Sequence, residues 1–166
     1  MLSTLRNRNF GLLWFAGLIS IAGNWILAIG LPIYIYRLTE STLATSAVFA
    51  AGMIPRLLLG SVAGVFVDRW DRKRTMVIAN LLMGLGLLPL LLVHSVESVW
   101  IVYIVQLFQA TVSQFFSPAE NALLPTLVGE DQLVSANALN SLNNNLGRLT
   151  GPVIGGFVAG LFGLGG

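Results

Sequence analysis

Long apolar stretches constrain this chain more than any other feature. The runs 10–36, 43–67, 75–93 and 99–116 together contain one charged residue, Arg56. A helix needs ~20 consecutive, mostly apolar residues to cross the hydrocarbon core of a bilayer. Nine basic and seven acidic residues are the only charges among 166 positions, whereas about a quarter of a soluble domain is charged. The pattern predicts an all-α integral membrane protein.

A fifth expected span, 134–164, differs from the other four. Its second half is apolar and rich in glycine, and its first half is polar. That first half carries five asparagines: Asn137, Asn140, Asn143, Asn144 and Asn145. Unpaired polar groups are costly in hydrocarbon, so this half cannot face lipid. We expect it to face protein or a watery cavity.

The connections between the expected spans differ in charge and length. Segments 37–42 and 94–98 read as short turns, 68–74 as a charged loop, and 117–132 as a longer polar segment. Basic residues gather before the first span and in the loop after the second, namely Arg6, Arg8, Arg69, Arg72, Lys73 and Arg74. Because cytoplasmic loops are enriched in Lys and Arg, we expect a cytoplasmic N-terminus. The membrane would be a plasma membrane, most simply a bacterial inner membrane.

Two further expectations concern the ends of the chain. Arg6 and Arg8 before an apolar run could mark a secretory signal, but the run 10–36 is too long for one. The chain stops at Gly166, at the end of the fifth span, which is an odd number of spans. We therefore expect residues 1–166 to be a partial N-terminal transmembrane bundle that lacks its second half.

Residue types that carry common chemistry are scarce. There is no cysteine and a single histidine, His94. Thiolate metal sites, disulfides and a histidine metal cluster are therefore excluded, and no nucleotide-binding or zinc motif is present. We expect no metal, no cofactor, no catalytic residues and no nucleic-acid partner, and hence a protein that is not an enzyme.

The charged loop resembles the loop motif of the major facilitator superfamily, Gly-x-x-x-Asp-Arg-x-Gly-Arg-Arg/Lys. The matching segment contributes Gly64, Asp68, Arg69, Asp71, Arg72 and Lys73. We expect Gly64 to allow close helix approach and Asp68 to pair with a cation or a helix N-terminus. The resemblance implies that this contact latches the outward-facing state. Asp71 replaces the second glycine, where we expect a turn with positive φ that aspartate tolerates. The alternative is a loop that only sets topology.

The glycine-rich helix resembles the fifth-helix motif of the same superfamily, Gly-x-x-x-Gly-Pro-x-x-Gly-Gly, best known from exporters of the antiporter type. Every defined position matches: Gly147, Gly151, Pro152, Gly155 and Gly156. Glycines four residues apart form a stripe that allows tight helix contact, and Pro152 can bend the helix. The alternative is a generic small-residue packing face.

Segment 116–139 resembles the link between the fourth and fifth spans in the branch that includes enterobactin and macrolide efflux proteins. Many proton-coupled exporters carry an acid in the first span and an arginine in the fourth. Here Asn24, Gln106 and Gln109 occupy the corresponding regions. None of these side chains can bind and release a proton at neutral pH. Glu120 is the only acid near the end of the fourth span, either as a proton carrier or as an ion-pair partner.

Polar residues inside the spans are candidates for a substrate cavity. Several recur every three or four residues on one helical face. The set comprises Asn24, Arg56, Gln106, Gln109, Ser113, Asn140, Asn144 and Arg148. In this superfamily, spans one, two, four and five line the cavity. Interhelical hydrogen bonding is the alternative for each residue.

The resemblance implies a secondary transporter, an exporter of drugs or siderophores that works by alternating access. Its partners would be the lipid bilayer, a small-molecule substrate, a coupling proton or ion, and the missing C-terminal half. One rival is a small membrane scaffold or assembly subunit that transports nothing. A membrane-embedded enzyme is disfavoured by the lack of paired acids or a nucleophile set within the spans.

Overall fold

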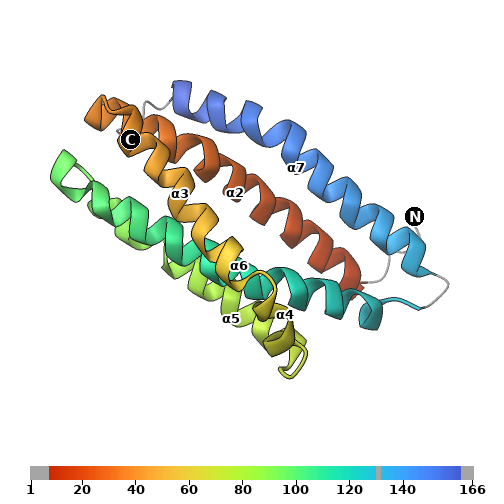
Figure 1. Cartoon of the computed structure of the whole chain (residues 1–166). Helices are drawn as coiled ribbons and strands as arrows, with labels where there is room; N and C mark the ends of the chain where they lie inside the picture. Colours follow the sequence, from red (N-terminus) through yellow and green to blue (C-terminus); the bar gives the residue numbers. More distant parts are fainter. Residues whose placement is uncertain (1–7, 130–131, 162–166) are drawn as a thin grey trace. The chain divides into compact units, whose positions relative to one another are not determined.

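The computed structural model describes residues 8–129 and 132–161, and within them every regular element is helical. Figure 1 shows the order of the helices along the chain. In that order they are α2 (Arg8–Thr39), α3 (Thr42–Leu59), α4 (Val62–Val67), α5 (Arg72–Leu85), the 3₁₀ segments η1 (Leu88–Leu92) and η2 (Val96–Ser98), α6 (Val99–Leu127) and α7 (Leu133–Leu161). The prediction of an all-α protein is confirmed.

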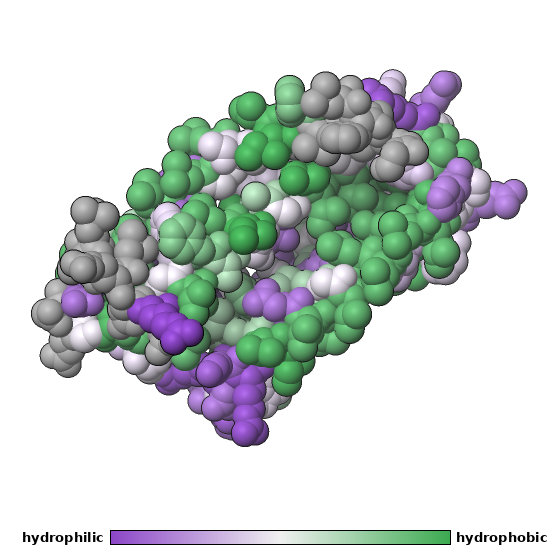
Figure 2. Space-filling view, turned by 180° about the vertical axis from the view of Figure 1, so that it is seen from behind, coloured by the Kyte–Doolittle hydropathy of each residue, from purple (hydrophilic) through white to green (hydrophobic). Residues whose placement is uncertain are grey.

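Four helical segments of the described chain are long and apolar enough to cross a membrane: Phe10–Thr39, Thr42–Leu59, Arg72–Leu92 and Val96–Leu127. Hydrophobic residues accordingly cover most of the face seen in Figure 2, and hydrophilic residues are confined to a few groups. Helix α7 has 29 residues but is not among the four. The fifth expected span, 134–164, is therefore not among the described segments that are apolar enough to cross a membrane, because the asparagine-rich first half of α7 lowers its mean hydropathy.

Two connections differ from the sequence expectation. The polar segment expected from residue 117 onward is wrong in its first part, since α6 continues to Leu127. Helix α6 contains Pro118 and Pro125, and proline is tolerated in membrane helices where neighbouring groups satisfy the freed carbonyls. The second expected span is divided, because α3 ends at Leu59 and the short α4 begins at Val62.

The chain divides into two compact units. The first contains the described residues of Met1–Leu31 and Leu124–Gly166, and the second contains Pro32–Leu123. The first unit therefore holds the start of α2, the end of α6 and all of α7. The second holds the end of α2, helices α3 to α5 and most of α6.

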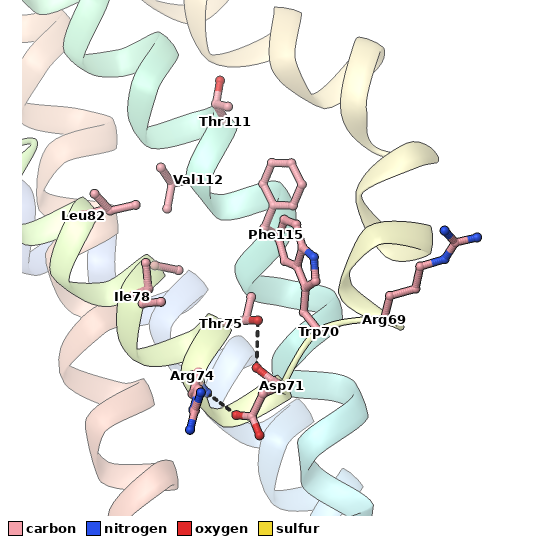
Figure 3. Close-up of a pocket in the computed structure, with 11 residues that line it drawn as sticks. Arg69, Trp70, Asp71, Arg74, Thr75, Ile78, Leu82, Thr111, Val112 and Phe115 are labelled. Carbon is pink, nitrogen blue, oxygen red and sulfur yellow. Dashed lines mark hydrogen bonds between the residues drawn. The ribbon is translucent and has the colours of Figure 1, made fainter.

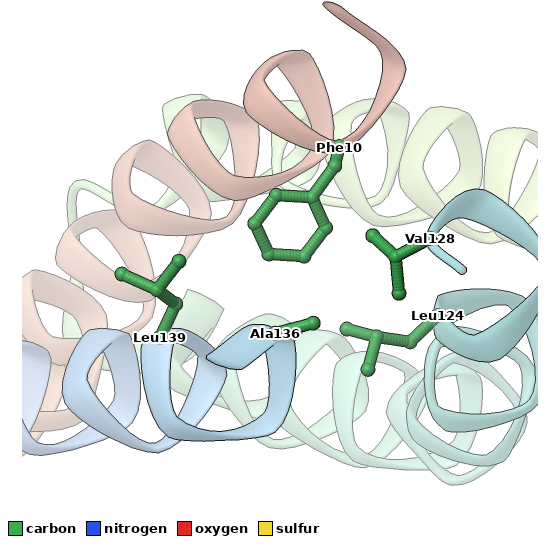
Figure 4. Packing of buried hydrophobic residues seen from close by; sticks show 5 residues of the cluster. All are labelled: Phe10, Leu124, Val128, Ala136 and Leu139. Atoms are coloured by element: carbon green, nitrogen blue, oxygen red, sulfur yellow. The ribbon is translucent and has the colours of Figure 1, made fainter. Parts of the chain in front are cut away.

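Buried side chains of the first unit close one end of the α2–α7 pair. Phe10, Leu124, Val128, Ala136 and Leu139 form this cluster, and each is at least nine-tenths buried. Figure 4 shows the ring of Phe10 turned toward the aliphatic groups from the other segments. In a bilayer such packing stabilises mainly through van der Waals contact, because lipid is as apolar as these side chains.

Side-chain hydrogen bonds to backbone carbonyls join the helices of the second unit. The Tyr34 hydroxyl donates to the Val93 carbonyl (2.6 Å), and the Tyr103 hydroxyl donates to the Ala44 carbonyl (3.0 Å). The Gln109 amide donates to the Met83 carbonyl (2.7 Å). These bonds tie the end of α2 to the segment after η1, α6 to α3, and α6 to α5.

Candidate functional site

Two glycines of the fifth-helix motif lie directly against α2 within the first unit. A Cβ added at Gly147 would overlap the side chain of Ile21, and one at Gly151 would overlap Trp25. Figure 1 shows α7 running alongside α2. No larger residue fits at either position without displacing α2, which is the close approach that a glycine stripe permits.

The rest of the fifth-helix motif is less confined. A Cβ at Gly156 would meet nothing within 4 Å. Pro152 lies inside α7 and is exposed. Gly155 belongs to the same helix, but its surroundings lie outside the described residues. The tight contact therefore rests on two of the motif's glycines.

A polar clamp continues the α2–α7 contact along the helices. The indole N–H of Trp14 donates to the Leu139 carbonyl (2.9 Å), and the amide of Asn143 donates to the Trp14 carbonyl (3.1 Å). Asn143 is 2% exposed, and its Oδ1 has no hydrogen-bond partner in the described chain. A Cβ at Gly17 would lie 2.9 Å from the Asn143 amide nitrogen, so glycine makes room for this side chain.

Asn143 was not singled out by the sequence pattern. The helical spacing grouped Asn140 with Asn144, which is exposed, whereas Asn140 is half-buried and lies three residues before Asn143 on the same side of α7. The signal that could have found it is the offset from Gly147, since residues four apart on a helix share a face. Asn143 therefore belongs to the same α2-facing stripe as the two packed glycines.

The loop motif lies between α4 and α5 in the second unit. Asp68 directly follows α4, and its backbone N–H bonds to the Gly64 carbonyl (3.0 Å). Asp71 caps α5, because its carboxylate accepts a hydrogen bond from the backbone N–H of Arg74 (2.7 Å). Arg72 reaches α6, where its guanidinium donates to the Ala122 carbonyl (2.9 Å).

One expectation about this loop is wrong. Asp71 does not have a positive φ: its φ is −66° and its ψ is 112°, the extended conformation of an N-cap residue. Aspartate therefore fits this position as a helix cap, not as a substitute for glycine's freedom. A Cβ at Gly64 would meet nothing within 4 Å among the described residues, so the role of Gly64 in close helix approach stays a prediction.

The carboxylate of Asp68 has no hydrogen bond or ion pair within the described part of the chain, and its side chain is exposed. Arg69 and Lys73 are likewise exposed. Asp68, Arg69 and Lys73 thus present charges of both signs that no side chain in the described part of the chain neutralises. The latching role of Asp68 stays a prediction.

The candidate cavity residues of the second unit are partly engaged in helix packing. Gln109 is bonded across to α5, and the Gln106 amide nitrogen would lie 3.0 Å from a Cβ at Gly52 of α3. Ser113 is half-buried, and Arg56 is exposed. For Gln109, the hydrogen bond to the Met83 carbonyl therefore favours a role in joining helices over a role in a substrate cavity.

Glu120, also in the second unit, is half-buried in α6. Within residues 8–129 and 132–161 no basic side chain pairs with it. Its interpretation as a proton carrier or as an ion-pair partner stays open.

The candidate cavity residues of the first unit are more accessible. Asn24, Asn144 and Arg148 are exposed, and Asn140 is half-buried. The candidates are thus divided between the two units, and their sharing of one cavity stays a prediction.

These features define a helical membrane bundle with the two sequence motifs of a facilitator-type transporter. A family model described as "Transmembrane secretion effector" matches residues 1–165. The chain therefore belongs to the transmembrane secretion effector family of the major facilitator superfamily.

Named relatives agree with this membership. Macrolide efflux protein A of Streptococcus pyogenes is 28% identical over 87% of this chain and 36% of its own length. The uncharacterized MFS-type transporter YfiS of Bacillus subtilis is 32% identical over 87% of this chain and 34% of its own length. Enterobactin exporter EntS of Shigella boydii is 30% identical over 90% and 36%, respectively. The chain thus spans about a third of the length of these relatives. No solved structure matches it significantly.

Proposed function

We propose that this chain supplies the first five spans of the N-terminal bundle of a secondary exporter of small molecules. The observation that carries the proposal is the family match along residues 1–165. Both motifs of the resemblance support it, because one forms the α4–α5 loop and the other packs α7 against α2. The chain performs no chemistry on its substrate in this proposal.

Transport would proceed by alternating access, in which two bundles rock about a site near the middle of the membrane. The α2–α7 contact suits a bundle that moves as one body, because there is no free space between Gly147 and Gly151 on α7 and the side chains of Ile21 and Trp25 on α2. The exposed charges of the α4–α5 loop suit a contact that is made and broken as the bundles move. Asp68 is the residue that we assign to this contact.

The substrate class follows from the relatives alone. One is named for macrolide efflux and another for export of enterobactin. We propose a substrate of that kind, either a macrolide-like drug or a siderophore. Asn24, Arg56, Asn144 and Arg148 would offer hydrogen bonds and positive potential to its polar part.

The orientation is also part of the proposal. The N-terminus, the α4–α5 loop with Arg69, and the first turn of α5 with Arg72, Lys73 and Arg74 would face the cytoplasm of a bacterial cell. Export would then run from the loop side outward. Coupling to a proton would use Glu120, because Asn24, Gln106 and Gln109 cannot titrate.

The test is substrate accumulation in cells that carry or lack the native coding sequence. A panel of macrolides and siderophores is added, and the retained amount of each is measured with and without a protonophore. We expect deletion to raise the retained amount of at least one compound, and a plasmid copy to restore export. Unchanged retention across the panel, with the protein present in the membrane, would favour the scaffold alternative.

A further inference from the structure

A cavity of about 660 Å³ lies between α5 and α6 at the end nearest the loop 68–71. Figure 3 shows its wall, which is built by the loop and by one face of each helix. All of its lining residues belong to the unit Pro32–Leu123. Its volume falls within the ~300–1,000 Å³ typical of ligand pockets.

The lining changes character along the cavity. Arg69 and Arg74 lie on opposite sides of the loop end with their guanidiniums directed away from each other, and Ile78 and Leu82 line the part farther along α5 (Figure 3). Helix α5 begins at the charged loop and is part of a membrane span. The arginines therefore lie near the membrane–water boundary, and the aliphatic wall lies at hydrocarbon depth.

An aromatic pair forms the wall between these two ends. Trp70 stacks on Phe115 with ring centroids 5.9 Å apart and an interplanar angle of 24°. Trp70 is 49% exposed, so half of its surface remains available. Indole rings favour the headgroup level of a bilayer, where one side is apolar and the other is wet.

Two positive charges at the loop end are not compensated by the chain. Neither the Arg69 nor the Arg74 guanidinium has a hydrogen bond or ion pair in the described part of the chain. The one acid in the lining, Asp71, directs its carboxylate to the backbone N–H of Arg74. The lining therefore carries one net positive charge, next to an apolar wall.

We propose that this cavity binds an anionic phospholipid, with one acyl chain along Ile78, Leu82 and Phe115 and the phosphate at the loop end, which has Arg69 on one side and Arg74 on the other. An amphiphile with a negative head matches both ends of the lining. A free phosphate would leave the apolar wall empty, and a zwitterionic lipid such as phosphatidylcholine would bring a choline cation with its phosphate and so leave the net positive charge of the lining uncompensated. A further protein helix would bury those charges at a high desolvation cost.

The proposal goes beyond the exporter function and can be tested without a transport assay. The purified protein, produced from its native coding sequence, is reconstituted in phosphatidylcholine vesicles with trace phosphatidylglycerol brominated on its acyl chains. Bromine quenches nearby indoles. The Trp70 signal is the difference between the unaltered protein and the Trp70→Phe variant. We expect brominated phosphatidylglycerol to quench this signal at lower mole fraction than brominated phosphatidylcholine does.

Charge variants test the head-group contact. A basic side chain close to an anionic surface contributes ~1 kcal/mol, so we expect Arg74→Gln to weaken the preference for phosphatidylglycerol about fivefold. The double variant Arg69→Gln/Arg74→Gln should lose the preference. Arg74→Lys should keep most of it, which separates charge from folding. Lys73→Gln is the matched control, because Lys73 lies in the same basic run but does not line the cavity.

Four results would overturn the proposal. Equal quenching by both lipids would mean only that Trp70 touches the bilayer, and no quenching by either would mean that other protein covers the cavity. An equal loss in Lys73→Gln would indicate diffuse attraction to the surface. Displacement of the quencher by millimolar glycerol phosphate would indicate a site for free anions.

Discussion

The contact between α2 and α7 is closed by glycines, whereas α5 and α6 leave a cavity between them beside the loop 68–71, with arginines at its edge. At the first contact, a single methyl group at Gly147 or Gly151 would overlap the neighbouring helix. At the second, about 660 Å³ is open and two guanidiniums have no partner in the described chain. Both are contacts between helices of one membrane protein, yet only the α2–α7 contact is closely packed.

The difference distinguishes a helix contact that stays fixed from a helix contact that can exchange its partners. Small residues let helices approach closely, and close packing has few alternative arrangements. Exposed charges can exchange one partner for another, and an open cavity can be filled or emptied, at little cost in free energy. We infer that the α2–α7 pair is the fixed part of the bundle and that the loop end of α5 and α6 is the part that meets lipid or another bundle. The following predictions test that division.

The largest effect is expected at the glycine contact. Gly151→Ala places a methyl group against Trp25, and overpacking of this kind costs about 2 kcal/mol. Gly23→Ala is the control on α2, since a Cβ there meets nothing within 4 Å. Thermal unfolding of the detergent-solubilised protein should show a lower midpoint for Gly151→Ala alone. Equal midpoints for the two variants would contradict the tight contact.

A smaller loss is expected at the polar clamp. Asn143→Ala removes a buried hydrogen bond to Trp14 and leaves a small cavity, but it also removes an unpaired acceptor. We expect a net cost of about 1.5 kcal/mol. Trp14→Phe loses the bond to Leu139 and part of the indole's packing against the buried cluster, and it should cost a comparable amount. If both variants unfold like the unaltered protein, the clamp does not hold α2 to α7.

A local effect is expected at the start of α5. Asp71→Ala removes the N-cap bond to Arg74 and should cost about 1 kcal/mol. Asp71→Ser retains a capping oxygen and should cost less. The comparison of the two unfolding midpoints isolates the cap from the lost charge. A greater loss in Asp71→Ser than in Asp71→Ala would show that the cap is not the reason for aspartate here.

The smallest effect on stability is expected at Gly64. A Cβ there has free space, and alanine is favoured over glycine in a helix by up to about 1 kcal/mol. Gly64→Ala should therefore leave the unfolding midpoint unchanged or raise it slightly. A clear drop would show that Gly64 is a packing glycine like Gly151, and the contrast between the two motifs would fail.

The sequence predicted the helical membrane fold, because uninterrupted apolar runs have few other solutions. It also predicted the stripe at Gly147 and Gly151, because glycines spaced four residues apart can be recognised in the sequence itself. It did not predict that Trp25 and Ile21 fill the stripe, or that Asn143 is buried, because these depend on the register between two helices. The continuation of α6 past Pro118 and the cap at Asp71 were not predicted for a related reason. Each depends on which group forms a hydrogen bond with a particular backbone N–H or carbonyl.

The most direct test of the proposed gating role is efflux by cells that produce Asp68→Asn in place of the native protein. The substrate is the compound whose retention rises on deletion of the coding sequence, and Arg37→Gln, which removes an exposed charge outside the motif, serves as the control. At equal amounts in the membrane, we predict that Asp68→Asn loses most of the efflux rate and that Arg37→Gln retains it. Undiminished efflux by Asp68→Asn would contradict the assignment of the α4–α5 loop as the gate.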